Sequence, residues 1–153
     1  MARSRSELVV VVDRHRLGDW LFLDPVRTIR LVEHGDGRVT FGNLAHEVWD
    51  VTVPETPSRI VTVVDKLRGT HKNWWECDTG IAYLVSGVVG WRTVRMGQIY
   101  DLSDPAKPVF IRTFGLPGQE PGGRGQTPGG MHGAYSTGPK GNRVYFAYDV
   151  NRN

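Results

Sequence analysis

Short apolar runs separated by turn-forming residues are the dominant pattern along this chain. Three of them read LVVVV (residues 8–12), IVTVV (residues 60–64) and IAYLVS (residues 81–86). They are rich in β-branched and aromatic residues and are shorter than ordinary helices. The pattern therefore predicts strands joined by tight turns. The 19 glycines and nine prolines of the chain agree with a turn-rich β protein.

One segment of this pattern occurs twice. Residues 48–63 (VWDVTVPETPSRIVTV) recur as residues 99–114 (IYDLSDPAKPVFIRTF), shifted by 51 positions without a gap. The five identical pairs are Asp50/Asp101, Pro54/Pro105, Pro57/Pro108, Ile60/Ile111 and Thr62/Thr113. Each copy predicts a strand that ends in Asp, a turn preset by two prolines, and a returning strand. A period of roughly 40–50 residues made of short strands is typical of β-propeller blades.

A larger unit surrounds this repeat. Residues 69–87 and residues 131–149 share the order of a histidine, an aromatic residue, a polar turn and an apolar strand. The two histidines, His71 and His132, are 61 positions apart, and the additional ten residues fit inside residues 115–130, which hold seven glycines and three prolines. Because this composition disfavours regular structure, we predict a long, mobile loop that lies beside any site formed by His132.

The N-terminal part of the chain contains no copy of the repeat. The expected elements are strands at residues 7–13 and 19–23 and a hairpin over residues 27–41 that turns at HGDG, residues 34–37. Residues 1–45 are interpreted as either a β lead-in or a degenerate blade, and residues 46–153 as the region of recognisable blades.

The predicted fold is therefore all-β and built of β-propeller-type blades. Residues 46–153 supply about two blades, whereas closed propellers usually have 4–8. Either the chain is a piece of a larger propeller, or it is an incomplete propeller closed by self-association into a homo-oligomer. The sequence leaves both alternatives open, and under either we do not expect a stable monomer.

The segment IYDLSDPAKPVFI, an upstream HxxxW strand (His71 to Trp75) and an AYL strand (residues 82–84) carry a resemblance to a known family. Together they resemble the LVIVD-repeat β-propellers of bacteria over roughly residues 46–153, and residues 1–40 lie outside the likeness. The resemblance implies a propeller architecture. It does not imply one activity, because propellers serve both as binding platforms and as hydrolases.

Composition narrows the cellular setting. The net charge of the chain is +3, and its 15 arginines and four lysines are scattered along the sequence. A nucleic-acid-binding surface needs clustered basic residues, so we expect no nucleic-acid partner. Cys77 is the only cysteine, which excludes an intrachain disulfide, and we expect it to be a small, partly buried strand residue. No apolar run approaches the ~18 residues of a membrane span, and residues 8–12 are too short for a signal peptide. We therefore expect a soluble, cytoplasmic protein.

Candidate chemistry lies at the starts of strands, where three histidines occur close to acidic residues. The predicted catalytic residues are His71, His132 and Glu76, and the predicted metal ligands are His46, Glu47 and Asp78. Imidazole and carboxylate groups together bind a divalent cation, which lowers the pKa of a bound water; by analogy with propeller hydrolases we expect calcium. Without a metal, a His–carboxylate pair acts as a general base. The alternative is that each histidine is a structural latch to a neighbouring blade.

Tryptophans are the other candidates for a site. Trp74 and Trp75 are adjacent, so they must point to opposite faces of a strand and only one of them is expected in the core. We assign Trp75 and Trp91 to substrate binding, with core or inter-blade packing as the alternative.

Two functions follow from these assignments. The first is a hydrolase of small esters or lactones with a metal or His–carboxylate site at the propeller face. The second is a non-catalytic binding propeller that uses the same face for a ligand or a protein.

Overall fold

The computed structural model describes residues 9–13, 23–24, 27–28, 44–50, 56, 58–76, 78–127 and 129–149. Within this part the chain is built of antiparallel strands and one short helix, α1 (Gly138–Gly141). The strands are β1 (Val9–Asp13), β2 (Leu23–Asp24), β3 (Arg27–Thr28), β4 (Leu44–Asp50), β5 (Ser58–Leu67), β6 (Gly69–Thr70), β7 (Trp74–Glu76), β8 (Ile81–Gly87), β9 (Met96–Asp101), β10 (Val109–Phe114), β11 (Met131–Ser136) and β12 (Val144–Tyr148). The all-β class predicted from the sequence is confirmed for these residues.

The first sheet has the strand order β1-β4-β5. The strand expected at residues 7–13 is present as β1, but it pairs with β4 and so joins the sheet of the first repeat. The N-terminal region therefore contributes a strand to the first unit. Of the strand expected at residues 19–23 and the hairpin over residues 27–41, only the short β2–β3 pair lies within the described residues, and the HGDG turn lies outside them.

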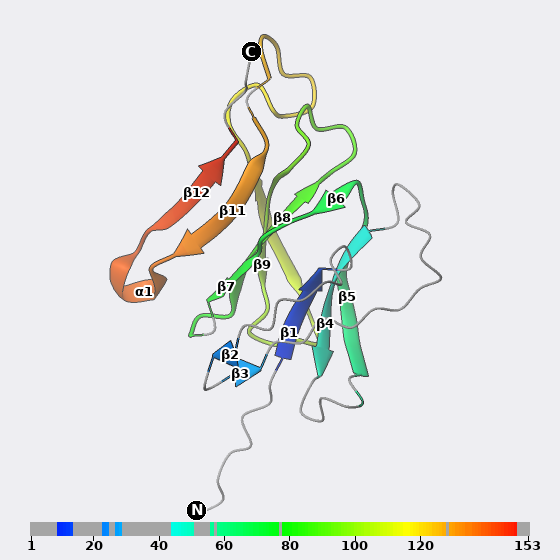
Figure 1. Ribbon diagram of the computed structural model, residues 1–153, viewed down its shortest axis with the longest axis vertical. Helices are drawn as coiled ribbons and strands as arrows, with labels where there is room; N and C mark the ends of the chain where they lie inside the picture. Colours follow the sequence, from blue (N-terminus) through cyan, green and yellow to red (C-terminus); the bar gives the residue numbers. More distant parts are fainter. Residues whose placement is uncertain are drawn as a thin grey trace, which may run out of the picture.

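The central sheet is a meander in which β7, β8, β9 and β10 follow one another as antiparallel neighbours. β6 pairs with the other half of β8, in line with β7. Between β6 and β7 the side chain of Asn73 replaces a backbone partner, because its Oδ1 accepts a hydrogen bond from the Val85 N–H at 2.9 Å. The third sheet consists of β11 and β12, joined through α1 (Figure 1).

The two copies of the sequence repeat form the same hairpin. β4 pairs with β5 as β9 pairs with β10, and both pairs share one register over residues 47–50 and 98–101; before residue 47 the first pair has further register shifts that the second lacks. The equivalent partners are Asp50↔Ser58 with Asp101↔Val109, and Val48↔Val61 with Ile99↔Arg112. One additional residue bulges from the returning strand at the same point, Ile60 in the first copy and Ile111 in the second. The gap-free repeat thus encodes the side-chain alternation and the position of the bulge as well as the strands.

The turn of the second copy is held by hydrogen bonds to its acidic residues. Asp101 Oδ1 accepts hydrogen bonds from the backbone N–H of Ser103 at 2.8 Å and from its hydroxyl at 2.6 Å. These hydrogen bonds hold the pKa of Asp101 below its usual value. Asp104 Oδ1 accepts from the Ala106 N–H at 3.1 Å. Most of the corresponding turn of the first copy lies outside the described residues.

The three sheets pack face to face in chain order (Figure 1). One face of the central sheet meets the first sheet in the main hydrophobic cluster, in which Val48, Ala82, Leu84, Tyr100 and Leu102 are buried and Val61, Val63, Val64 and Trp75 pack against them. The opposite face meets the third sheet through Phe146, whose ring stacks on Phe114 at 4.4 Å and contacts Tyr83 at 6.3 Å between centroids. None of these sheets closes on itself within the described residues. In the same part of the chain, no helix has the length and apolar character needed to cross a membrane.

Leu84 lies at the centre of this packing and is fully buried. Replacing it with alanine removes the contact of β8 with the first sheet and should lower the free energy of unfolding by about 2–5 kcal/mol. Val89→Ala is the matched control, because Val89 is 63% exposed in the turn after β8. Urea denaturation of both variants tests the assignment, and equal stabilities for the two would contradict it.

Candidate functional site

The structure brings His71 and His132 into direct contact. His71 Nε2 lies 3.2 Å from His132 Nδ1, and the two rings meet edge to face with centroids 4.6 Å apart. A parallel bridge between Lys72 and Gly133 sets the two chain segments side by side. The contact therefore joins the central sheet to the third sheet.

The two histidines occupy equivalent places in their sheets. His71 follows the pair Thr70↔Ser86, and His132 follows the pair Met131↔Tyr148; in each case the strand then carries one additional residue before pairing resumes. The larger repeat expected from the sequence thus has a structural counterpart, and it places both imidazoles at the same local irregularity of the backbone.

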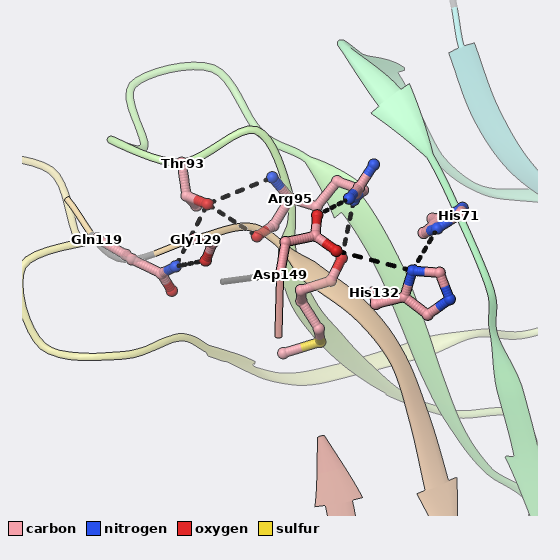
Figure 2. Close-up of polar contacts among 8 residues, drawn as sticks. His71, Thr93, Arg95, Gln119, Gly129, His132 and Asp149 are labelled. Carbon is pink, nitrogen blue, oxygen red and sulfur yellow. Dashed lines mark hydrogen bonds and ion pairs between the residues drawn. The ribbon is translucent and has the colours of Figure 1, made fainter. Parts of the chain in front are cut away.

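An acidic residue outside the predicted set completes this cluster. Asp149 follows β12, and its Oδ1 lies 3.8 Å from His132 Nδ1. Its other oxygen, Oδ2, accepts a hydrogen bond from Arg95 Nη2 at 2.5 Å, and Arg95 Nε donates to the Met131 carbonyl at 2.8 Å. Figure 2 shows the resulting line of contacts from Arg95 through Asp149 and His132 to His71. The side chains of His132 and Asp149 are 44% and 48% exposed, so solvent reaches the cluster.

The position of Asp149 favours one protonation pattern of His132. A carboxylate near Nδ1 favours a proton on that nitrogen, and an imidazole protonated there is unprotonated at Nε2 unless it is cationic. The other contact of Nδ1, His71 Nε2, can accept this proton. Within the described residues, no hydrogen bond to His132 Nε2 is present.

The Gly/Pro-rich loop at residues 115–130 is tied to the same cluster. Gln119 is fully buried, and its Nε2 donates to the Gly129 carbonyl at 2.7 Å and to Thr93 Oγ1 at 3.3 Å. Thr93 Oγ1 in turn donates to the carbonyl of Arg95 at 3.0 Å (Figure 2). Arg92 Nη2 also donates to the Gly125 carbonyl at 2.7 Å. The loop leads directly into β11, which carries His132, and these contacts give its described part a defined path.

His46 lies at a different boundary, between the first and central sheets. It is fully buried on β4, and its Nδ1 lies 3.3 Å from Asn73 Nδ2. Burial lowers the pKa of His46 to about 3, so the imidazole is neutral and Nδ1 accepts from the Asn73 amide. His46 corresponds to Gly97 in the 51-residue repeat, so the expectation that it opens a strand equivalent to those of His71 and His132 is wrong.

The predicted acidic partners are also placed apart from the histidine pair. Glu47 is buried, and its carboxylate accepts from Trp49 Nε1 at 3.0 Å and from Arg59 Nη1 at 3.1 Å. Neighbouring strand residues point to opposite faces, which separates Glu47 from His46. Asp78 is exposed in the turn between β7 and β8. The described residues contain no group of three His, Cys, Asp or Glu side chains placed to hold a metal ion, so His46, Glu47 and Asp78 do not form the metal site assigned to them.

Glu76, the last residue of β7, is held by hydrogen bonds away from the histidine pair. Its carboxylate accepts from Thr79 Oγ1 at 2.8 Å, from Tyr83 OH at 3.1 Å and from Ser136 Oγ. Partial burial acts to raise the pKa of Glu76, but the hydrogen bonds from Ser136, Thr79 and Tyr83 outweigh it and leave that pKa below its usual value. Glu76 lies five positions after His71, at the far end of β7. Glu76 therefore joins the central and third sheets rather than the histidine pair.

The adjacent residues Trp74 and Trp75 lie on opposite faces of β7, as the alternation of a strand requires. Trp75 packs against the main hydrophobic cluster, whereas Trp74 contacts Tyr135 with ring centroids 4.7 Å apart. Trp75 thus lies in the core packing that was the alternative to substrate binding. Trp91 lies against Gly115 at the start of the loop. Cys77 lies outside the described residues.

Sequence patterns did not reveal Arg95 and Asp149. They are 54 positions apart, and Asp149 corresponds to Gly87 in the larger repeat, so no copied motif marks it. The chain matched no protein-family model, no curated protein and no solved structure. Any assignment of function therefore depends on the geometry of this cluster.

Burial of His46 predicts a stability that depends on pH. The unfolded chain binds a proton at His46 below pH 6.5, while the folded chain keeps it neutral down to about pH 3. Stability should therefore fall as the pH drops below 6.5, by up to about 1.4 kcal/mol per pH unit from this group. Urea denaturation at pH 7 and pH 5 should show a smaller loss for His46→Asn, which keeps an acceptor for Asn73, than for the wild-type chain. Equal losses would contradict the prediction.

The hydrogen bonds of Gln119 should make the loop at residues 115–130 resistant to proteolysis. Gln119→Ala removes two donated hydrogen bonds and one accepted from the Leu116 N–H. Each is worth on the order of 1 kcal/mol, so cleavage within residues 115–130 should accelerate at least about tenfold. Arg124→Ala, an exposed change in the same loop, is the control. Rapid cleavage of the wild-type loop at the same rate as the Gln119 variant would overturn this assignment.

Proposed function

We propose that this protein is a hydrolase of small esters or lactones in which His132 is the general base that activates water. The observation that carries the proposal is the position of His132 Nδ1, 3.2 Å from His71 Nε2 and 3.8 Å from the Asp149 carboxylate, on a ring that is 44% exposed. A base must be oriented through one nitrogen and reach substrate through the other, and this arrangement meets both needs.

The roles of the residues follow from their contacts. His132 Nε2 takes a proton from water as the water oxygen attacks the carbonyl carbon of the substrate. Asp149 stabilises the imidazolium that forms, and Arg95 holds Asp149 in place. When the tetrahedral intermediate collapses, the bond from carbon to the leaving oxygen breaks, and the imidazolium returns its proton to that oxygen. His71 keeps the His132 ring in position through the Nε2–Nδ1 contact.

Water is the proposed nucleophile because Ser136, which lies on the same strand as His132, is already hydrogen-bonded to other groups. Ser136 is buried, donates to Glu76 and accepts from the Gly138 N–H at 3.0 Å. The mechanism does not need a metal ion. The expectation of calcium remains a separate prediction, and chelation tests it.

We also propose that the three sheets are blades of a β-propeller of the LVIVD-repeat type. Support comes from the register that the β4–β5 and β9–β10 hairpins share over residues 47–50 and 98–101, from their common bulge, and from the face-to-face packing of the sheets in chain order. Successive antiparallel sheets that repeat one hairpin in this way are the building principle of propellers.

A non-catalytic binding protein is the second candidate function. It is favoured by a row of aromatic side chains over β7, β11 and β12, formed by Trp74, Tyr135 and Tyr145, of which the two tyrosines are 52% and 53% exposed. Exposed aromatic rings provide large contact areas for a ligand or a protein partner.

Single substitutions of His132 and Asp149 test the proposed hydrolase activity. Against a panel of p-nitrophenyl esters and small lactones, His132→Ala should abolish turnover, and Asp149→Asn should lower kcat by about 10²-fold or more, the usual contribution of a general base or its supporting charge. Lys107→Ala is the control, because Lys107 is 82% exposed in the β9–β10 turn and pairs only with Asp104 there. Circular dichroism confirms that each variant is folded.

The outcomes separate the candidates. Full activity of folded His132→Ala, or no hydrolysis by the wild-type chain, would reject the proposed base and favour the binding protein. Loss of activity on addition of EDTA, restored by calcium, would replace the metal-free mechanism with a metal-dependent one.

A further inference from the structure

Two segments of the chain run side by side along the boundary between the central and third sheets, and equivalent residues of the larger repeat meet there. The three pairs are His71 with His132, Lys72 with Gly133, and Trp74 with Tyr135. Each pair is 61 positions apart, which is the spacing of the larger repeat. Lys72 is therefore the next residue along this boundary from the histidine pair.

The backbone places Lys72 beside His132. The residue before Lys72, His71, contacts the His132 ring, and the bridge partner of Lys72, Gly133, directly follows His132. The stem of Lys72 lies across this glycine, since a Cβ atom on Gly133 would be 3.3 Å from Lys72 Cβ and 3.9 Å from Lys72 Cδ. Because Gly133 has no side chain, the lysine has room on the surface next to the proposed base.

The charge of Lys72 is not matched by an acidic residue of the described chain. Lys72 is exposed, and among the described side chains none forms an ion pair with it. Asp149, the acidic residue of the cluster, is paired with Arg95. Arg92, three positions before Arg95, binds two loop carbonyls rather than a carboxylate. The described surroundings of His132 therefore carry excess positive charge, which attracts an anionic ligand.

We propose that Lys72 binds a carboxylate of the substrate, so that the preferred substrates are esters or lactones that carry a carboxylate a few bonds from the reacting carbonyl. This inference rests on the proposed hydrolase, since it names the substrate class of the same site. An ammonium group on a flexible, exposed stem suits a charged group at the surface. It suits the oxyanion of the reaction less well, because an oxyanion is stabilised by donors that are fixed in advance.

Two esters of similar size test the assignment. Mono-p-nitrophenyl adipate carries a free carboxylate, and methyl p-nitrophenyl adipate carries a neutral methyl ester in its place. After subtraction of the rate without protein, kcat/KM of the wild-type chain should be at least about fivefold higher for the anionic ester, mainly through a lower KM. The preference should disappear at about 1 M salt, where exposed charges are screened. Lys72→Gln should remove the preference, Lys72→Arg should keep it, and Lys72→Glu should reverse it.

Adipate itself gives a readout that needs no turnover. In isothermal titration calorimetry, its Kd should rise at least about fivefold in Lys72→Gln. Lys140→Gln is the control for both measurements, because Lys140 is also exposed but lies in α1, beyond the end of β11 that is far from His132. This variant should keep the substrate preference and the adipate affinity of the wild-type chain.

The two readouts separate a failure of this inference from a failure of the proposed hydrolase. Equal hydrolysis of both esters by the wild-type chain, or an unchanged preference in Lys72→Gln, overturns the inference and leaves the hydrolase in place. An equal fall of kcat for both esters in Lys72→Gln also overturns it, since that result assigns Lys72 to the oxyanion.

If neither ester is hydrolysed, the proposed hydrolase fails and adipate binding decides the role of Lys72. A wild-type chain that does not bind adipate, or one whose Kd equals that of Lys72→Gln, then overturns the inference. Far-ultraviolet circular dichroism shows whether each variant is folded. The salt dependence of the wild-type preference tests the inference without any substitution, and a preference that survives high salt counts against it.

Discussion

The central sheet is covered on both of its faces, and this packing dictates where polar side chains can lie. On one face Leu84 and Trp75 meet the first sheet, and on the other Phe114 meets the third. Polar groups caught between such faces need partners there. Two pairs cross the boundaries: His46 Nδ1 with Asn73 at one, and Glu76 with Ser136 at the other. His46 Nε2 has no hydrogen-bond partner among the described residues.

The contact between His71 and His132 is a third boundary pair, but its surroundings differ. His46 is fully enclosed and its burial suppresses protonation, so it can contribute only packing and a single hydrogen bond. His132 is open to solvent and has a carboxylate within 3.8 Å. The latch and the base are therefore not exclusive readings of one motif. The same repeated position joins two sheets through His71 and carries the proposed base on His132.

The sequence repeat predicted the hairpins well because a gap-free copy preserves alternation: Asp50 and Asp101 end equivalent strands, and the bulges at Ile60 and Ile111 coincide. It was less informative about the site. Proximity in sequence suggested that His46 and Glu47 act together, yet adjacent strand residues face opposite ways. The pairing of β1 with β4 and the ion pair of Arg95 with Asp149 are long-range contacts between segments with no shared motif. The pattern of neighbouring residues in the sequence does not show which distant segments pair in this way.

Arg95 connects the stability of the third sheet to the chemistry of the cluster. It lies just before β9 of the central sheet, and one guanidinium reaches both a carbonyl at the start of β11 and the carboxylate after β12. Two strands alone hold their relative position weakly. By binding the first residue of β11 and the residue that follows β12, Arg95 fixes the spacing between His132 and Asp149 from outside their sheet. The loop reaches Arg95 through Gln119 and Thr93, so the order of the loop and the geometry of the proposed base depend on one another.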